Sequence, residues 1–291
     1  MRSPLLMAIV VATGLVSTQA MADGLLSAVL PFSRAVQVGS TATAFGTILN
    51  DSAGTAVNCR VGKPSGFSGA FTYQRTNPAT NAAEGPQNTP VSIAPGAAQT
   101  FVFGMTPNTV TPGSEGLDDS LFAPIFTCDN VGPAPSNPGV NGFNLASTAG
   151  PTPDIIVVAA TIDNDGVLKL PGATGQSFFT AAAINIGASA TVLVTADNGE
   201  GVGTTEIPVD GYVCETQSDG TVIECATGDD LDEGFMFRSF ATNQIRYFTF
   251  VVTGQGFIPY DPANRRLFIG FLADGGDGEL VGATSIAVRT E

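Results

Sequence analysis

An internal repeat is the feature of this sequence that most constrains its fold. Four stretches of the first half match four stretches of the second half in the same order: 45–59 with 181–195, 99–107 with 246–254, 120–130 with 266–276, and 141–149 with 281–290. The matches place Asn50 opposite Asn185 and Phe101 opposite Phe248. Each match is weak by itself, but their shared order predicts two tandem copies of one structural unit.

Each copy has the sequence pattern of a β-sandwich. In the stretch 246–254, Phe248 and Phe250 would share one face of a strand, while Tyr247 and Thr249 would share the other. Turn residues separate such runs at intervals of about 8–12 residues, and no long helical periodicity interrupts them. The sequence therefore predicts an all-β protein made of two tandem immunoglobulin-like β-sandwich domains.

The predicted domains are residues 23–150 and residues 151–291. The boundary falls within 149–154, where Pro151 and Pro153 are expected to stiffen a short, exposed linker. Each copy is long enough to bury a core of its own without a cofactor. The copies are expected to fold independently.

The second copy contains an insertion. Matched positions lie 135 residues apart at Asn50 and Asn185, but 147 residues apart at Phe101 and Phe248. About twelve extra residues therefore fall within this interval, which holds both cysteines of the second copy and the acidic run 228–234. Whatever distinguishes the second copy is expected there.

Three stretches carry a resemblance to a known group of proteins: 33–50, 72–103 and 260–290. They resemble uncharacterised exported proteins of Gram-negative bacteria that contain tandem immunoglobulin-like modules. The resemblance covers most of the chain after the leader, and it implies the fold and an exported location. It implies no catalytic or ligand-binding residues, because none are defined for that group.

Residues 1–22 have the features of an export signal peptide. Arg2 gives a positive start, residues 5–16 are apolar, and residues 20–22 form a small-x-small cleavage site. A membrane anchor is the alternative, but polar residues break the apolar stretch, which falls short of about 20 residues. The predicted location is the periplasm, the cell surface or the medium, with no membrane insertion.

The charge of the chain excludes some partners. Residues 23–150 carry seven acidic and four basic residues, a net charge of −3, whereas residues 151–291 carry 19 acidic and six basic residues, a net charge of −13. Binding to phosphate backbones or anionic lipids relies on lysine and arginine. Nucleic acid and membrane surfaces are therefore not expected partners.

Four cysteines in an exported chain predict two disulfides. A two-residue turn at Asp219-Gly220 would place Cys214 opposite Cys225, within reach of a disulfide. This leaves Cys59 to pair with Cys128. A zinc site is the alternative, but the chain has no C-x-x-C spacing and no histidine, so disulfides are favoured.

The absence of histidine also removes every catalytic arrangement that depends on it. No glycine-rich phosphate loop is present. Paired carboxylates could hydrolyse glycosides, but no specific pair stands out, and the chain has no tryptophan to stack against sugars. The sequence therefore predicts a non-enzymatic protein without a cofactor.

Two acidic segments raise the question of calcium. The sequence "DNDG" (163–166) fails the spacing of an EF-hand loop, because Thr161 and Gly172 occupy two ligand positions, so a turn between strands is favoured. The denser cluster is Asp229, Asp230, Asp232 and Glu233. A solvated loop is the main prediction for this cluster, and a calcium site is the alternative.

These features predict an exported structural or interaction protein. Protein binding and self-association remain as the expected kinds of contact. The alternative functions are a calcium-stabilised surface module and a filament or adhesin subunit, in which the apolar segment 23–32 would be lent to a neighbouring sheet. In the competing interpretation, which is favoured, this segment covers an edge of its own sheet.

Overall fold

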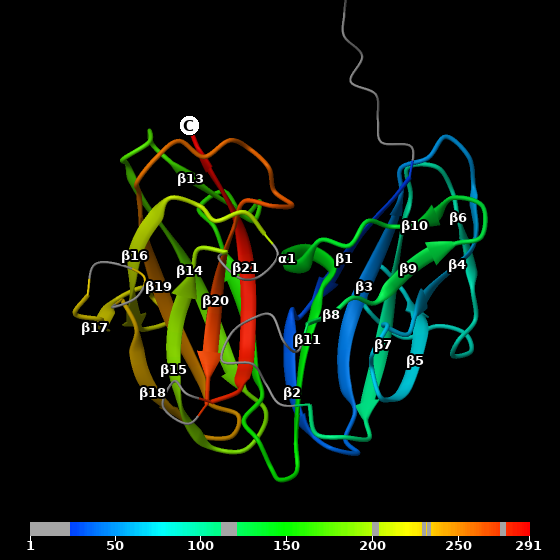
Figure 1. Ribbon diagram of the computed structural model, residues 1–291, viewed down its shortest axis with the longest axis horizontal. Coiled ribbons are helices and arrows are strands. Elements are labelled where there is room, and N and C mark those ends of the chain that lie inside the picture. Colours follow the sequence, from blue (N-terminus) through cyan, green and yellow to red (C-terminus); the bar gives the residue numbers. More distant parts are fainter. Residues whose placement is uncertain (1–23, 112–120, 200–203, 229–230, 232–233, 274–277) are drawn as a thin grey trace, which may run out of the picture.

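The computed structural model describes residues 24–111, 121–199, 204–228, 231, 234–273 and 278–291, which form an all-β protein (Figure 1). The one helix among these residues, α1 (Pro138–Asn141), is a single turn. The all-β prediction is confirmed. The described part of the chain contains no helix of the length and hydrophobicity that a membrane span requires. The predicted signal peptide lies outside the described residues.

The strands of the N-terminal half form three sheets, with the orders β1-β3-β7-β5, β10-β9-β4-β6 and β2-β11-β8. Their bounds are β1 (Leu25–Leu30), β2 (Ser33–Gln37), β3 (Ala42–Asn50), β4 (Ala56–Gly62), β5 (Gly69–Thr76), β6 (Val91–Ile93), β7 (Ala98–Pro107), β8 (Leu121–Phe122), β9 (Ile125–Cys128), β10 (Gly132–Pro133) and β11 (Phe143–Thr148).

The strands of the C-terminal half form two sheets, with the orders β12-β14-β19-β16-β17 and β13-β21-β20-β15-β18. Their bounds are β12 (Ile155–Ala160), β13 (Val167–Leu170), β14 (Gln176–Asn185), β15 (Ala190–Asp197), β16 (Val209–Thr216), β17 (Val222–Cys225), β18 (Met236–Phe240), β19 (Ile245–Gly254), β20 (Arg266–Leu272) and β21 (Leu280–Thr290).

The two halves share one strand plan. The order β1-β3-β7-β5 corresponds to β12-β14-β19-β16, and β2 pairs with β11 in parallel as β13 pairs with β21. The register agrees as well: Gly46 is paired with Phe101, and Ala181 is paired with Phe248. The sequence matches therefore mark equivalent strands. At the edge where β17 pairs with β16, the described part of the first half has only the isolated bridge Thr76–Ala83 beside β5.

This strand plan is that of an immunoglobulin-type sandwich. In that type, four strands in the order A-B-E-D face a second sheet built around strands G, F and C. β12, β14, β19 and β16 follow the first order, and β21, β20 and β15 follow the second. In the N-terminal half, the short strands β8 and β9 together take the place of β20, because Pro124 lies between them and has no N–H for the ladder.

Each half has an apolar core, and the C-terminal core also includes Ala35 and Ala146 of the N-terminal half. Phe101 and Phe103 of β7 lie in the N-terminal core, and Phe248 and Phe250 of β19 lie in the C-terminal core, all 2% exposed or less. Burying each such ring contributes about 1.5–3 kcal/mol. The alternation of buried and partly exposed residues along β19 is the one that the sequence predicts for this strand.

Asn50 and Asn185 hold equivalent turns, and both are fully buried. In each case the amide oxygen accepts a hydrogen bond from the backbone N–H two residues further on, at 3.1 and 3.0 Å. The amide nitrogen donates to a carbonyl oxygen of the same turn, Gly54 O at 2.8 Å or Ala188 O at 2.7 Å. Asparagine is suited to this role because its side chain can both donate and accept.

A buried ion pair joins the two halves. The guanidinium of Arg34, on β2, donates to the carboxylate of Asp154 at 2.8, 3.0 and 3.1 Å, and the two side chains are only 9% and 6% exposed. The backbone N–H of Ala35 also donates to this carboxylate, at 3.1 Å. The expected linker is therefore not exposed throughout: Pro151 is exposed, but Pro153 and Asp154 are buried. The sequence around Asp154 does not indicate that its partner is Arg34, 120 residues earlier, so the burial of this part of the linker could not be predicted from sequence.

Apolar contacts extend this junction. Phe32 packs with Phe268, at 5.9 Å between ring centroids, in a cluster that also contains Leu272 and Leu280. These contacts cover part of the outer face of the sheet β13-β21-β20-β15-β18. In Figure 1, β2 and β11 lie on the side of the N-terminal half that approaches β21, whereas β17 lies on the remote side of the C-terminal half. The opposite sheet of the C-terminal half, β12-β14-β19-β16-β17, thus presents its outer face away from the junction.

Candidate functional site

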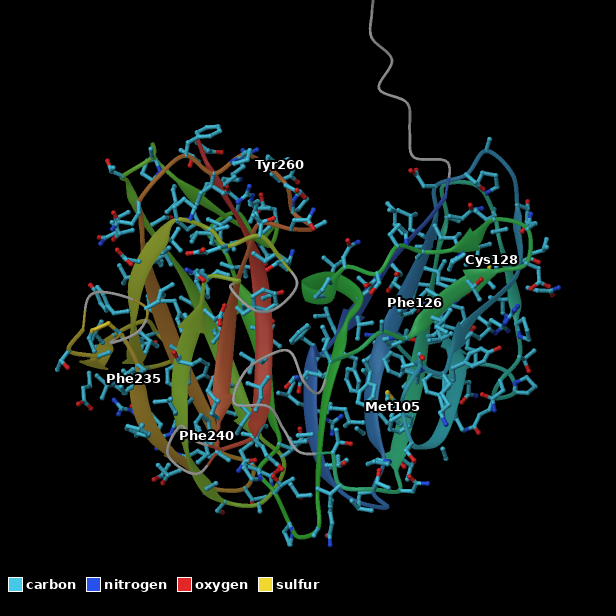
Figure 2. The ribbon with its side chains drawn as sticks, in the orientation of Figure 1. Met105, Phe126, Cys128, Phe235, Phe240 and Tyr260 are labelled. Atoms are coloured by element: carbon cyan, nitrogen blue, oxygen red, sulfur yellow. A yellow bond between two sulfur atoms is a disulfide. The ribbon has the colours of Figure 1, made fainter. Side chains whose placement is uncertain are left out.

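Both disulfides have the pairing expected from the sequence. Cys59, on β4, is bonded to Cys128, on β9, and both are buried in the N-terminal core. Figure 2 shows Cys128 near Phe126, which lies on the same strand. Cys214, on β16, is bonded to Cys225, on β17. No free cysteine is present among the described residues.

The turn of the hairpin that carries Cys214 and Cys225 differs from the expected two-residue turn, although the two cysteines are paired as expected. A two-residue turn would pair Ser218 with Thr221, but instead the N–H of Gln217 donates to the Thr221 carbonyl at 2.8 Å, which makes a three-residue turn. Gly220, with φ +87°, supplies the left-handed conformation that this turn needs. A bulge in β17 then shifts the register by one and restores the pairing of the two cysteines.

An ion network fixes the base of this hairpin. Glu215, 6% exposed, accepts a hydrogen bond from Arg238 at 2.6 Å and forms a second ion pair with Arg246. Arg238 also contacts Glu224 on β17, at 2.8 Å. Because Arg238 belongs to β18 in the opposite sheet, the network joins the two sheets at the edge where β17 lies.

The acidic cluster predicted as a calcium alternative lies outside the described residues at Asp229, Asp230, Asp232 and Glu233. Within the described ranges, no three histidine, cysteine, aspartate or glutamate side chains come together as a metal site requires. Calcium binding by the cluster therefore remains a prediction.

The segment "DNDG" forms a turn between β12 and β13. Asn164 and Gly166 both have positive φ, and the N–H of Val167 donates to the Asp165 carboxylate at 3.0 Å. Lys169 forms ion pairs with both acids of the segment, including Asp165 at 2.9 Å. Hydrogen bonds from Lys169 and then from the Val167 N–H lower the pKa of Asp165. The charges of this segment are thus occupied within the turn.

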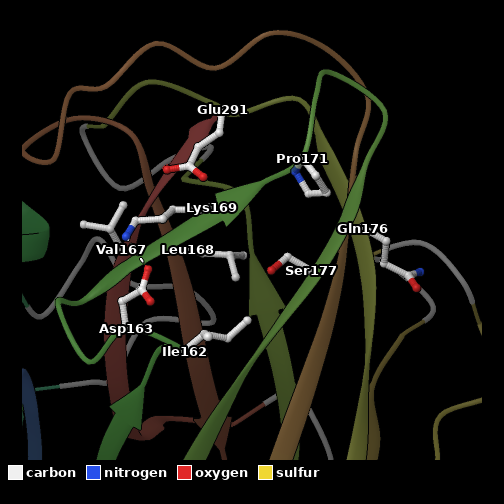
Figure 3. Close-up of a pocket in the computed structure, with 9 residues that line it drawn as sticks. All are labelled: Ile162, Asp163, Val167, Leu168, Lys169, Pro171, Gln176, Ser177 and Glu291. Carbon is white, nitrogen blue, oxygen red and sulfur yellow. Dashed lines mark hydrogen bonds and ion pairs between the residues drawn. The ribbon is translucent and has the colours of Figure 1, made fainter.

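A small cleft of about 270 Å³ lies beside this turn, lined by β13, the start of β14 and Glu291 (Figure 3). The figure shows Lys169 directed toward Asp163. Hydrogen bonds to Asp163 and Asp165 raise the pKa of Lys169, so its amine is held as a cation. A lysine that acts as a base or nucleophile needs the opposite shift. This cleft therefore provides a neutralised cation rather than a reactive group.

The outer face of the sheet β12-β14-β19-β16-β17 offers a larger surface, called the outer face below. Three apolar rows of paired, outward-directed residues cross it: Ile156–Ile184–Ile245, Val158–Ala182–Tyr247 and Phe178–Val251–Tyr212. The row Ala160–Thr180–Thr249, with two threonines, lies between the second and the third. Val158 is 66% exposed, Ile245 50% and Phe178 48%. No lysine or arginine occurs in these rows. Exposed apolar residues grouped on one face are typical of contact surfaces.

The hairpin divides the outer face into two grooves. The larger groove, about 380 Å³, is lined by Phe178, Tyr212 and Val222, and the smaller, about 260 Å³, by Val158 and Tyr247. Thr180, on β14, and Gly220, at the hairpin tip, line both. Since β14 is not a neighbour of β17 in the sheet, the hairpin must curl over the outer face. The lining of both grooves contains no charged residue.

The sequence pattern assigned Tyr247 and Thr249 to one side of their strand, and the structure places them on the outer face. The prediction missed that this side remains uncovered and that it is apolar across three neighbouring strands. The sequence did contain an indication of this surface. In 156–160 and 176–184, the residues directed to both faces of the strand are apolar or uncharged. Such strands resemble those of a sheet covered on both sides.

Comparisons with known proteins give little further information. No family model matches the sequence, and no curated protein matches it. Among solved structures, a marsupial T cell receptor is 10% identical over 91% of this chain and 99% of the receptor chain, with a TM-score of 0.24. A likeness at this TM-score supports no conclusion about this protein, so the fold rests on its own strand order.

Proposed function

We propose that this protein is an exported, non-enzymatic interaction protein and that the outer face is its contact surface. The observation that carries the proposal is the group of exposed apolar side chains on the outer face, in a chain whose formal net charge is −15. A chain with this many acidic residues could have placed carboxylates at the outward positions of a face that stays in contact with water. Val158, Phe178 and Ile245 instead leave a large apolar area in contact with water, which partner binding would remove.

Export is supported by three independent features. The leader at 1–22 has the pattern of a signal peptide, the two disulfides are compatible with an oxidising compartment, and three stretches resemble exported bacterial proteins. In the cleft beside the "DNDG" turn, the cation Lys169 is neutralised by Asp163 and Asp165. A binding role therefore agrees better with the geometry than catalysis does.

Strand donation has weaker support than binding through the outer face. The segment that would be lent to a neighbour forms β1, which pairs with β3 of the same chain along its whole length. Leu25 and Val29 of this strand are buried in the N-terminal core. Releasing β1 would remove both side chains from the core, so the segment is better suited to covering its own sheet.

The proposal is tested by site-specific photocrosslinking in producing cells. A photoreactive residue in place of Val158 or Phe178 should give a discrete crosslinked product, because both side chains project from the outer face. The same residue in place of Ala79, an exposed position in a loop of the N-terminal half, should give none. Equal products at all three positions, or none at Val158 and Phe178, would contradict the proposal.

A further inference from the structure

The charges around the outer face point to the kind of partner that it accepts. Two carboxylates border the grooves: Asp210, two residues from Tyr212 on β16, and Asp219, next to Gly220. Glu224 is paired with Glu215 and is turned with it toward Arg238 of the opposite sheet. Asp210 and Asp219 form no ion pair with any described lysine or arginine. The border of the grooves is therefore negative while their lining is neutral.

The two unpaired carboxylates are held in place by neutral donors. The side-chain amide of Gln255 donates to Asp210 at 2.6 Å, and the N–H of Thr221 donates to Asp219 at 2.9 Å. Hydrogen bonds from Thr221 lower the pKa of Asp219, which keeps its charge at the tip of the hairpin. Since neutral donors orient a carboxylate without cancelling its charge, both groups remain available to a cation.

The hairpin gives these features a fixed shape. The Cys214–Cys225 disulfide and the Arg238 network hold its base, so Asp219 and the wall between the grooves keep their positions relative to the sheet. A partner needs little rearrangement of this surface on binding, which lowers the entropic cost of the contact.

We propose that the outer face binds a basic polypeptide segment, with apolar side chains in the two grooves and lysine or arginine side chains against Asp210 and Asp219. This inference rests on the proposed function and names its partner by charge and hydrophobicity. A second copy of the chain is disfavoured, because it would bring the same carboxylates and a net charge of −15 to the contact.

The test is a titration of the mature protein with three labelled short peptides, followed by fluorescence anisotropy. The peptides have alternating valine and lysine, alternating valine and glutamate, and alternating serine and lysine. Only the valine–lysine peptide should bind well, and added salt should weaken it. The double variant Val158→Ser/Phe178→Ser should bind it about tenfold less tightly, as expected for the loss of apolar burial.

Two matched variants separate the contributions. Phe45→Ser removes an exposed phenylalanine from the equivalent sheet of the N-terminal half, where the described residues include no disulfide-linked hairpin, and should leave the affinity unchanged. Asp210→Asn/Asp219→Asn should weaken binding at low salt and have little effect at high salt. Equal loss with Phe45→Ser would mean that any apolar sheet face suffices and would overturn the assignment to the grooves.

The remaining outcomes also decide the matter. Equal binding of the serine–lysine peptide would show attraction by net charge alone, and equal binding of the valine–glutamate peptide would exclude a basic partner. A dimer in sedimentation velocity that Phe178→Ser abolishes would assign the outer face to a second copy. If no peptide binds while the photoreactive residue at position 158 still gives a crosslink, the proposal of a basic partner is wrong and the proposed function stands. If there is also no crosslink, the proposed function and the proposed partner are both wrong.

Discussion

The two halves of this chain follow the same strand plan but use their disulfides differently. In the N-terminal half, Cys59–Cys128 joins strands that are 69 residues apart and lies in the core. In the C-terminal half, Cys214–Cys225 closes a hairpin over 11 residues at the edge of a sheet. The first bond restricts the unfolded chain most, because it closes the longer loop. The second fixes the shape of a surface.

The outer faces of the two halves differ in the same way. The N-terminal sheet has an apolar row, Leu30–Phe45–Val102, at the position where the C-terminal sheet has Ala160–Thr180–Thr249. Among the described residues, only the C-terminal half has a hairpin held by a disulfide at this edge of the sheet, and this hairpin lies in the interval where the sequence comparison places the insertion. A repeated fold can thus gain a site by adding one pinned hairpin to an existing sheet, without altering the core.

The strongest expected effect comes from separating the halves with Arg34→Ala. This change leaves the Asp154 carboxylate buried without its partner, which should lower the free energy of unfolding by about 3–5 kcal/mol. The intact chain should melt in one calorimetric transition and the variant in two. Arg60→Ala is the control, because its pair with Asp129 is 40–48% exposed and should contribute about 1 kcal/mol or less. A single, unshifted transition in the Arg34 variant would show that the halves are not coupled at this junction.

Removing the disulfides should distinguish their roles. Cys59→Ala/Cys128→Ala should lower the free energy of unfolding by about 4 kcal/mol, and Cys214→Ala/Cys225→Ala by about 3 kcal/mol, from loop entropy. Denaturant titration measures both. Only the second variant should lose affinity for the valine–lysine peptide. If the first variant loses affinity as much while still folded, the distinction between a core bond and a surface bond is wrong.

Asn50→Ala and Asn185→Ala compare equivalent turns. Each change leaves buried backbone groups without a partner, at a cost of about 1–3 kcal/mol. Asn50→Ala should cost about 1 kcal/mol more, because Asn50 also donates to the Ile93 carbonyl at 2.9 Å and accepts from the Ser52 hydroxyl at 2.6 Å, whereas the one additional bond of Asn185 is from the N–H of Asp154, at 3.1 Å. Equal denaturation midpoints for the two variants would show that the larger number of bonds at Asn50 contributes nothing.

The smallest effect concerns the exposed "DNDG" turn. The pKa of Asp165 is lowered from 3.8, so the folded state binds its proton less readily than the unfolded state. Its contribution to stability is therefore complete above about pH 4 and is lost as the pH falls through the folded pKa. For Lys169, whose pKa is raised from 10.5, the contribution is lost at alkaline pH above that value. Nuclear magnetic resonance titration of Asp165 should give a pKa below 3.8, and Lys169→Met should raise it toward that value without reaching it, because the hydrogen bond from the Val167 N–H remains.

Much of the fold and part of the candidate site could be predicted from the sequence. The stretches that match between the two halves occur in the same order, and they predicted that the strands with Phe101 and Phe248 are equivalent. This was possible because the alternation of residues along a strand and the order of repeats can be read directly from the sequence. The cysteine pairs could be assigned because few pairings exist. The turn geometry at Asp219-Gly220 could not, because a bulge elsewhere in the hairpin compensates for a change of turn length.

The sequence by itself determined which side chains share a face of each strand, but only the tertiary structure decided which faces are covered. Alternation along β14 places Phe178 and Phe179 on opposite sides, and nothing in the stretch 176–185 indicates which of them meets water. The same holds for Asp154, whose burial depends on an arginine 120 residues away. Covering a face requires contacts between segments distant in sequence, and these are set by the packing of whole sheets rather than by local pattern.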